Sequence, residues 1–262
     1  MLLFDRLAIR PEVPETFLVS GVINRCGSMR FDLRAWGQKF AYYYGEWESD
    51  LIAICRDLYN GGDFVDIGSS LGLYIVCMGD LIKKCGGAIF SVEPLTFNLN
   101  RQRANLEMNG LLSQVVFVQA ALGAEAGSVL ISFDPDQIDN NAIVGQSGVP
   151  IPVRRLDEVL PDSDSRIGFV KIDVEGYEPE VLAGGWDVIQ NHRPFILAEF
   201  NRARMKINGT NMIEAVRNFR HLSYKMFRSE GRRLIELSEP GDFENLFFIP
   251  SERSLPRSLL RT

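Results

Sequence analysis

Short apolar runs alternate with amphipathic segments along most of this chain. The runs are four or five residues long and predict strands at 64–67, 88–92, 115–118, 169–172, 195–198 and 245–249. Between them, apolar residues recur at steps of three and four, which predicts helices at 51–58, 71–82, 95–108, 179–182 and 211–219. We therefore expect an α/β fold, a sheet with helices on both faces.

Two stretches interrupt this pattern. Residues 1–46 are irregular, with short strands expected at 17–23 and 29–33. Farther along, an extra strand at 129–133 is followed by a polar stretch, 134–150, that predicts a loop, and 149–153 is expected to pair back with the extra strand. We expect one domain at 47–250, an N-terminal extension at 1–46 and a tail at 251–262.

Composition narrows the class of protein. Apolar residues make up 46% and charged residues 24% of the 262, which is ordinary for a globular chain. The net charge of −6 weighs against an extended nucleic-acid surface, so we expect no nucleic-acid partner. No apolar run approaches the roughly 18 residues of a membrane span. Asp5 and Arg6 stand where a signal peptide would need its apolar stretch, so we expect a cytoplasmic protein.

Cysteine and histidine are too few and too scattered for a zinc cluster. The four cysteines form no C-x-x-C pair, which predicts reduced, buried thiols rather than a disulfide framework. The two histidines, His192 and His221, exclude a metal site built from several imidazoles and give little support to a histidine-based triad.

The first predicted strand of the sheet leads into a glycine turn, Asp66-Ile67-Gly68-Ser69-Ser70-Leu71-Gly72. In open α/β sheets, ligands bind at the carboxyl ends of the strands, so this turn is a candidate ligand site. Gly68 allows a tight turn and close approach to the backbone, and Gly72 lets the following helix pack on the sheet. Asp66 replaces the first glycine of the dinucleotide pattern G-x-G-x-x-G.

A carboxylate at this place repels a pyrophosphate but favours a cation. S-adenosylmethionine, with its sulfonium and ammonium groups, is such a ligand. Glu93, at the end of the next predicted strand, is suited to accept hydrogen bonds from both ribose hydroxyls. Residues 120–122 follow the third strand and are placed to offer backbone groups, Ala121 among them, to the adenine. The candidate cofactor residues are Asp66, Gly68, Ser69, Ser70, Gly72, Glu93 and Ala121.

With these residues in place, the chain resembles the FkbM family of S-adenosylmethionine-dependent methyltransferases. The matching motifs are Gly45-Glu46-Trp47-Glu48, the segment 64–74, Glu93-Pro94, Asn105 with Asn109, Leu156-Asp157, the string K-I-D-V-E-G-Y-E at 171–178 and the segment 194–199. Ser69 and Ser70 replace the family's usual Ala-Asn, and Arg155 replaces a threonine.

The resemblance implies a class I methyltransferase fold, a seven-stranded Rossmann-like sheet whose last strand is antiparallel. It also implies O-methylation of a hydroxyl on a small natural product or a saccharide. Some members of the family methylate sugars, including the fucose of rhizobial lipo-oligosaccharide nodulation signals. The family is broad, so the resemblance does not carry the acceptor over to this chain.

Acids at the ends of the fourth and fifth predicted strands are the candidates for catalysis: Asp173, Glu175 and Glu199. A hydroxyl is a weak nucleophile at neutral pH, so a base must take its proton or a metal must acidify it. One of these acids would be the base, with Asp173 or Glu175 favoured, or two of them would hold a divalent metal. Lys171 is placed to pair with one of them.

Three other functions compete with methyl transfer to a hydroxyl. A nicotinamide-dependent oxidoreductase is disfavoured by Asp66 in the phosphate turn. An RNA or DNA methyltransferase is disfavoured by the acidic charge and by the D-V-E-G string at 173–176, in place of an N/D-P-P-Y element. A cofactor-binding module without catalysis is disfavoured by the acids at three strand ends.

Overall fold

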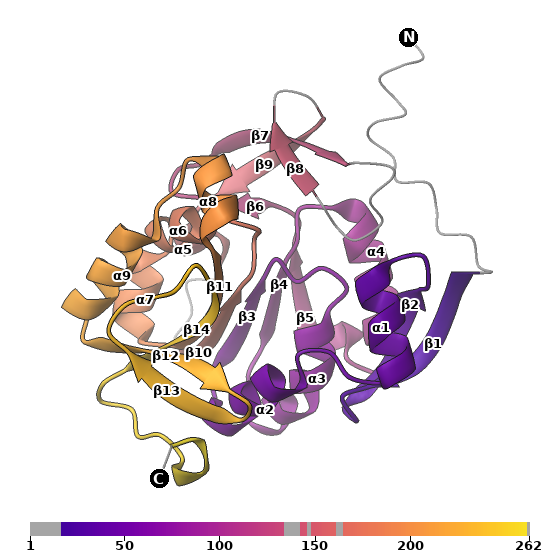
Figure 1. Ribbon diagram of the computed structural model, residues 1–262. Helices are drawn as coiled ribbons and strands as arrows, with labels where there is room; N and C mark the ends of the chain where they lie inside the picture. The colour runs from indigo at the N-terminus through magenta and orange to yellow at the C-terminus, as the bar shows by residue number, and fades with distance from the viewer. Residues whose placement is uncertain (1–16, 134–141, 146–147, 161–164, 261–262) are drawn as a thin grey trace.

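The computed structural model describes residues 17–133, 142–145, 148–160 and 165–260 (Figure 1). Its centre is an eight-stranded sheet in the order β13-β12-β14-β11-β10-β3-β4-β5. The strands are β3 (Asp63–Ile67), β4 (Ile89–Val92), β5 (Val115–Val118), β10 (Ile167–Ile172), β11 (Phe195–Asn201), β12 (Tyr224–Glu230), β13 (Arg233–Leu237) and β14 (Phe243–Pro250). The chain leaves β3 toward one edge and β10 toward the other, so the strand order reverses between these two neighbours.

This sheet confirms the expected fold class and extends it by one strand. β3, β4, β5, β10 and β11 are parallel, and β14 runs antiparallel to both of its neighbours. Seven strands therefore have the arrangement that the family resemblance implies. The eighth, β13, is an additional edge strand paired antiparallel with β12.

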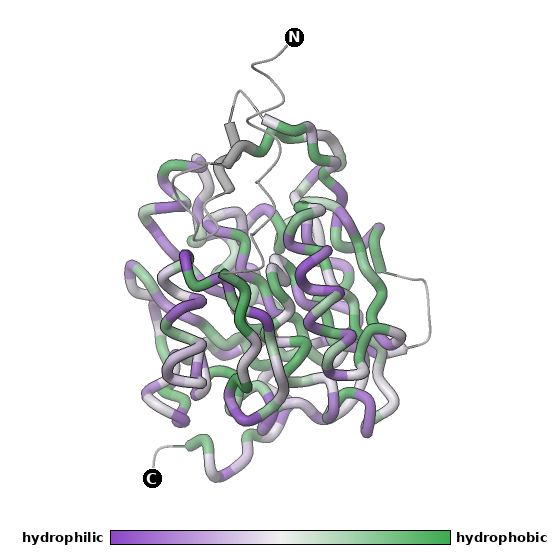
Figure 2. The backbone as a smooth tube through the Cα atoms, turned by 90° about the vertical axis from the view of Figure 1, so that its right-hand side faces the viewer, coloured by the Kyte–Doolittle hydropathy of each residue, from purple (hydrophilic) through white to green (hydrophobic). Residues whose placement is uncertain are grey.

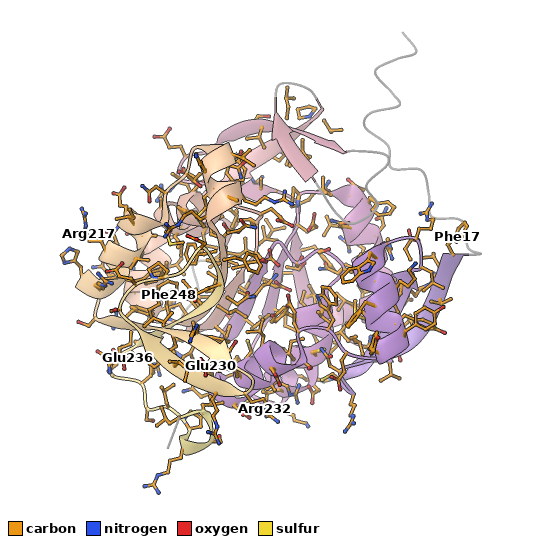
Figure 3. The ribbon with its side chains drawn as sticks, in the orientation of Figure 1. Phe17, Arg217, Glu230, Arg232, Glu236 and Phe248 are labelled. Atoms are coloured by element: carbon orange, nitrogen blue, oxygen red, sulfur yellow. The ribbon has the colours of Figure 1, made fainter. Side chains whose placement is uncertain are left out.

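The apolar-run pattern does not predict the β12–β13 hairpin because its strands alternate apolar and polar residues. Met226 and Leu234 are buried, whereas Lys225 and Arg233 are exposed. Figure 3 labels three exposed residues of this hairpin, Glu230, Arg232 and Glu236, and Phe248 of the neighbouring β14. Charged side chains on an edge strand discourage pairing with other chains.

Two hydrophobic cores, one on each face, hold the helices against the sheet. One face is covered by α2 (Ser49–Leu58), α3 (Leu73–Lys84) and α4 (Thr96–Met108), and the other by α5 (Leu156–Val159), α6 (Glu178–Ala183), α7 (Trp186–His192) and α9 (Met212–His221). Along β3, Phe64 enters the first core and Val65 the second, as the period of a strand requires. Figure 2 shows hydrophilic and hydrophobic residues alternating along the helices.

The N-terminal part of the described chain packs on this frame. The two short strands expected here are present as β1 (Leu18–Ile23) and β2 (Gly27–Asp32). They pair as an antiparallel hairpin, and α1 (Trp36–Tyr44) follows. Asn109, the residue that follows the last turn of α4, binds both backbone groups of Ser28, accepting from its N–H at 2.9 Å and donating to its carbonyl at 2.7 Å. Asn105 accepts from the N–H of Arg30 at 2.9 Å. These two asparagines bind the free edge of β2 as a neighbouring strand would.

A second small sheet lies beyond β5. It contains β6 (Ala121–Leu122), β7 (Gly127–Phe133), β8 (Ala142–Gly145) and β9 (Val149–Arg154) in the order β6-β9-β7-β8. The expected pairing of 129–133 with 149–153 is confirmed. The expectation of a loop throughout 134–150 is wrong at β8, where the apolar segment 142–145 pairs with β7. Residues 134–141 and 146–147 lie outside the described chain.

The remaining elements are short. They are α8 (Arg202–Asn208) and two 3-10 turns, η2 (Leu112–Gln114) and η3 (Arg257–Leu259). Leu259, within the expected tail, is 1% exposed and belongs to the first core, and Leu260 pairs with Leu234. No helix in the described residues has the length and apolarity needed to cross a membrane.

Candidate active site

The carboxyl ends of β3, β4, β10 and β11 open into one cavity of about 1380 Å³. It lies where the strand order reverses, which is where open α/β sheets bind ligands. Of the described side chains on its wall, the basic ones are Lys171 and Arg204. Acidic side chains outnumber them: Glu48, Glu93, Glu125, Asp173, Glu175, Glu180 and Glu199. The cavity therefore favours a ligand that carries positive charge.

The glycine turn is joined to the loop that follows β10. Gly68 has a φ of 73°, and a Cβ at this position would collide with the carbonyl oxygen of Asp173. The Asp173 N–H donates to the carbonyl of Ile67 at 3.0 Å, and the Gly68 N–H donates to the carbonyl of Val92 at 2.9 Å. Only glycine fits here, because the turn needs a left-handed residue and there is no room for a side chain.

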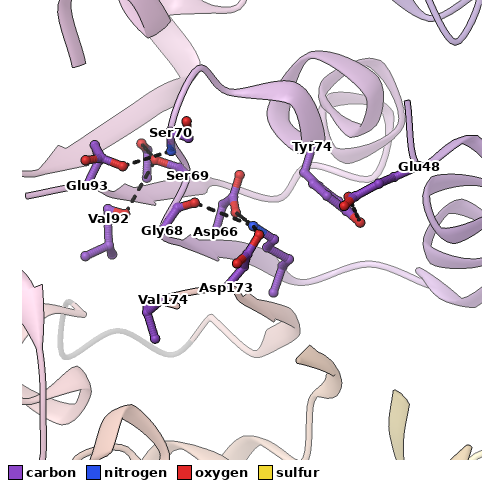
Figure 4. A network of polar contacts seen from close by, with 12 residues as sticks. Glu48, Asp66, Gly68, Ser69, Ser70, Tyr74, Val92, Glu93, Asp173 and Val174 are labelled. Carbon is purple, nitrogen blue, oxygen red and sulfur yellow. Dashed lines mark hydrogen bonds and ion pairs between the residues drawn. The ribbon is translucent and has the colours of Figure 1, made fainter. Parts of the chain in front are cut away.

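Glu93 lies at the end of β4 and is buried, which raises the pKa of its carboxyl. It accepts a hydrogen bond from the backbone N–H of Ser70 at 2.9 Å (Figure 4). It also accepts from the N–H of Leu95 at 3.0 Å and from Nδ2 of Asn98 at 3.2 Å. The Oδ1 atom of Asn98 is buried without a hydrogen-bond partner among the described residues. This corner of the cavity thus presents a carboxylate beside an unused acceptor, a pair suited to hydroxyl groups.

The other expected cofactor residues have different surroundings. Ser69 and Ala121 lie on the cavity wall, but the Ser69 hydroxyl is turned into a buried network with Ser91 and Gln102, both at 2.8 Å. Gly72 begins α3 with a φ of 82°, and a Cβ there would press on the Gln102 side chain. Ser69 therefore offers the cavity its backbone, and Gly72 acts through helix packing.

Asp66 lies behind the wall and not on it. Its side chain is 1% exposed, and Oδ1 is 3.7 Å from Nζ of Lys171. Neither carboxylate oxygen has a hydrogen-bond partner among the described residues. Burial, with the charges of Asp173 and Glu48, raises the pKa of Asp66 to about 6 despite Lys171.

Lys171 stands among these acids. Its Nζ is 3.2 Å from Oδ2 of Asp173, and it lies 5.1 Å from the centre of the Tyr74 ring. Burial alone would lower the pKa of the ammonium, but the carboxylates of Asp173, Asp66 and Glu48 raise it above its usual value. Lys171 is therefore a fixed positive charge at the wall of the cavity.

The expected catalytic acids come together at one side of the cavity. Burial, the charge of Asp173 and a hydrogen bond to it raise the pKa of Glu199 to about 9, so the two carboxyl groups share a proton at neutral pH. Glu175 has a φ of 57°, and its Oε2 is 3.6 Å from Nε of Arg204. Glu178 instead ties the loop together, accepting from the N–H groups of Val174 at 2.9 Å and Gly176 at 3.2 Å.

Sequence reasoning did not single out Glu48 as a site residue. It precedes α2, lines the cavity and accepts a hydrogen bond from the Tyr74 hydroxyl at 2.7 Å. Burial raises the pKa of its carboxyl. Glu48 belongs to the family motif Gly45-Glu46-Trp47-Glu48, which could have marked it as a candidate. The motif alone, however, does not predict that Glu48 lies near the end of β10.

The side chains described around the cavity do not form a recognisable group of metal ligands. Within the parts of the chain that the structure describes, no three His, Cys, Asp or Glu side chains are grouped to hold a metal ion. The ammonium of Lys171 already pairs with Asp66 and Asp173 on the neighbouring strand ends.

Comparison with known proteins gives this site its context. Residues 66–226, more than half of the chain, match the model of the FkbM methyltransferase domain. The chain belongs to the FkbM methyltransferase family. The resemblance seen in the motifs is thereby confirmed, and methyl transfer is the class of reaction.

Two curated relatives of this FkbM protein are also methyltransferases. Methyltransferase sdnD of Sordaria araneosa is 26% identical over 178 residues, which cover 52% of this chain and 68% of that protein. Methyltransferase 1 of Beauveria bassiana is 26% identical over 155 residues, covering 48% and 61%. A crystal structure of methyltransferase FkbM from Methylobacillus flagellatus aligns at a TM-score of 0.49 and 18% identity, over 72% of this chain and 43% of that one.

Proposed function

We propose that this FkbM protein binds S-adenosylmethionine at the carboxyl ends of β3, β4 and β5 and methylates a hydroxyl group of a small molecule or saccharide. The observation that carries the proposal is a single acidic cavity with Glu93 at one strand end and the Asp173–Glu199 pair at another. The bound cofactor supplies a methyl group on a cationic sulfur.

The residues present fit this cofactor. Glu93 and the unused Oδ1 of Asn98 offer acceptors for the ribose hydroxyls. Gly68 and Ser70 allow close approach to the turn, and Ala121 lies on the wall beyond Glu93 for the adenine. The excess of carboxylates suits a ligand with two cationic groups.

We infer that Asp173 is the base that takes the acceptor proton. Lys171 holds one side of its carboxylate and Glu199 shares a proton with it. Both interactions orient the remaining lone pairs toward the cavity, where a hydroxyl is to be deprotonated as the methyl group is transferred. Glu175 is less suited, because Arg204 faces its carboxylate and its side chain is 49% exposed.

The cavity has room for a second ligand beside the cofactor. At about 1380 Å³ it exceeds the roughly 300–1,000 Å³ of common small-molecule pockets. Trp36, Trp47 and Phe243 add aromatic surface to its wall, and Asn208 and Asn245 add amides. Such a lining suits an acceptor with both apolar faces and hydroxyl groups.

The first test measures binding and transfer separately. We expect calorimetric binding of S-adenosylhomocysteine, weakened at least tenfold by Glu93→Ala. With labelled S-adenosylmethionine and a panel of hydroxylated acceptors, Asp173→Asn should keep cofactor binding and lose transfer by about 10²–10⁴-fold. Asp187→Asn, an exposed acid on α7, is the matched control and should change neither.

Two results would count against the proposal. A folded wild-type protein that does not bind S-adenosylhomocysteine removes its basis. A methyl group found on nitrogen or carbon of the product, by mass spectrometry and NMR, replaces O-methylation by another reaction. Cofactor binding without transfer to any acceptor favours a binding module.

A further inference from the structure

We propose that Glu48 binds the ammonium group of the methionine half of S-adenosylmethionine, an inference that rests on the proposed function. Glu48 would accept hydrogen bonds from that ammonium while the Tyr74 hydroxyl holds its other oxygen. Glu48 is then a binding residue that lies outside the matched family domain of residues 66–226.

Position is the first argument. Glu93 and Glu48 lie on opposite sides of the glycine turn, with Gly68 and Asp66 between them (Figure 4). Both carboxylates line the same cavity. A ligand with its ribose at Glu93 and its sulfur near Asp173 therefore extends its remaining end toward the side where Glu48 lies.

Charge is the second argument. Oε2 of Glu48 accepts the Tyr74 hydroxyl at 2.7 Å, and no cationic side chain lies within 4 Å of the Glu48 carboxylate in the described part of the chain. Lys171 pairs instead with Asp66 at 3.7 Å and Asp173 at 3.2 Å. The half-buried Glu48 carboxylate thus has one neutral hydrogen-bond partner and only the more distant charge of Lys171, and such a carboxylate is costly unless a cation completes it. An ammonium group would do so with charge-assisted hydrogen bonds.

Preorganisation is the third argument. Glu48 has a φ of 50°, a left-handed conformation that is unfavourable for a residue with a side chain and concentrates at functional sites. The neighbouring Trp47 is held by Asn24, which accepts from its N–H at 2.9 Å and donates to its carbonyl at 2.7 Å. The backbone thus keeps Glu48 in one strained position before any ligand arrives.

The test compares two ligands that differ in the methionine half. S-adenosylhomocysteine has the amino-acid end, and 5′-methylthioadenosine has the same adenosine and sulfur without it. For Glu48→Gln we expect calorimetric affinity for S-adenosylhomocysteine to fall about 10- to 100-fold, as for a lost hydrogen bond between charged groups. Affinity for 5′-methylthioadenosine should stay within twofold of wild type.

Three further variants sharpen the comparison. Glu93→Gln should weaken both ligands, because both contain the ribose. Tyr74→Phe should weaken S-adenosylhomocysteine alone, by less than Glu48→Gln, and it serves if Glu48→Gln does not fold. Glu46→Gln, an exposed acid two residues away, is the matched control and should change neither ligand.

The outcomes distinguish failure of the Glu48 inference from failure of the proposed cofactor binding. If Glu48→Gln weakens both ligands equally, Glu48 is a structural counter-charge for Lys171 and the inference is wrong. It is also wrong if neither ligand is affected. If the wild-type protein binds neither ligand, the proposed function fails and the inference falls with it.

Discussion

Lys171 places one positive charge among the acids at the strand ends. It faces Asp66 on β3 and Asp173 just beyond β10, so it neutralises repulsion between two neighbouring strands at the point where they end. The buried ammonium lies 3.2 Å from the Asp173 carboxylate and holds it in place. In the proposed reaction it is a positioning residue, since it acts through Asp173.

Glu199 makes a prediction about pH. Its pKa is raised to about 9 in the folded protein from an ordinary 4.5, so between these values the folded state holds a proton that the unfolded state has lost. Stability should therefore fall as pH rises from about 4.5 to 9. Glu199→Gln is neutral at every pH and removes this contribution. We expect the melting temperature of wild type to drop at least about 2–4 °C more than that of the variant between pH 5.5 and 8.5.

Thermal unfolding at several pH values, followed by circular dichroism, checks the Glu199 effect. Asp66 and Glu178 have pKa values raised to about 6 and about 7, and their contributions have the same sign but are present in both proteins. Exposed Glu214 provides the control, because Glu214→Gln should leave the pH dependence of wild type intact. Parallel curves for wild type and Glu199→Gln would show that Glu199 titrates normally.

For the individual residues, the sequence predicted which acidic side chains lie close together but not which partner each of them has. Asp66, Glu93, Asp173 and Glu199 all lie at or beside the carboxyl ends of parallel strands, and parallel strands end at one edge of the sheet. Glu48 precedes the first strand of the main sheet, so its place depends on packing between distant segments. A local sequence pattern does not predict packing of this kind.

Among the elements, α4 makes the most specific connection. Asn105 and Asn109 are one helical turn apart, and both face the edge of β2. The family resemblance marks this N-x-x-x-N pair, but its spacing alone says only that the two side chains share a helix face. The structure shows what that face does, since the two asparagines hold the N-terminal hairpin beside the cavity.

Asn109→Ala should loosen this hairpin. The substitution leaves the N–H and carbonyl of Ser28 without their partner, so we expect a loss of about 1–3 kcal/mol in the free energy of unfolding. Hydrogen exchange across 18–32 should accelerate. Asn191→Ala, on an exposed position of α7, should alter neither quantity. Unchanged hydrogen exchange in Asn109→Ala would mean that contacts with β1 and α1 are enough to hold β2 in place without the asparagine.

The strands differ in how far their sequences predict them. The buried parallel strands are continuous apolar runs, which stand out along the chain. β12 and β13 alternate polar and apolar residues near the edge of the sheet, and β8 is a four-residue strand whose partner is β7. Their pairing depends on neighbours brought by the fold.

Across the whole molecule, the chain returns at its C-terminal part to the core formed by its N-terminal half. Leu259 of η3 is 1% exposed and belongs to the same core as Leu51 and Ile75. This closure could not be read from the sequence, because residues 251–262 show no apolar period. The three arginines and one proline of this segment are typical of unpacked chain. Three of its leucines nevertheless contact the folded protein, since Leu259 is buried in the core, Leu255 packs against it and Leu260 pairs with Leu234.

Leu259→Ala should therefore destabilise the whole protein. We expect the free energy of unfolding to fall by about 2–5 kcal/mol, as is usual when a buried leucine side chain is removed. Urea unfolding measures this loss. The adjacent Leu260→Ala is the matched control, since Leu260 is 41% exposed and its pairing with Leu234 is through the backbone. For Leu260→Ala the loss in the free energy of unfolding should stay below about 1 kcal/mol. Equal costs for the two variants would show that η3 does not seal the core.

The contact between Gly68 and the carbonyl of Asp173 has a consequence for the timing of catalysis. In the proposed reaction this turn lies beside the methyl donor and Asp173 is the base. The two are joined by the Asp173–Ile67 hydrogen bond and leave no space for a side chain between them. Their separation is set when the sheet folds, so the entropy of bringing donor and base together is lost once, during folding, and not in every turnover. What remains for each cycle is the alignment of the acceptor alone.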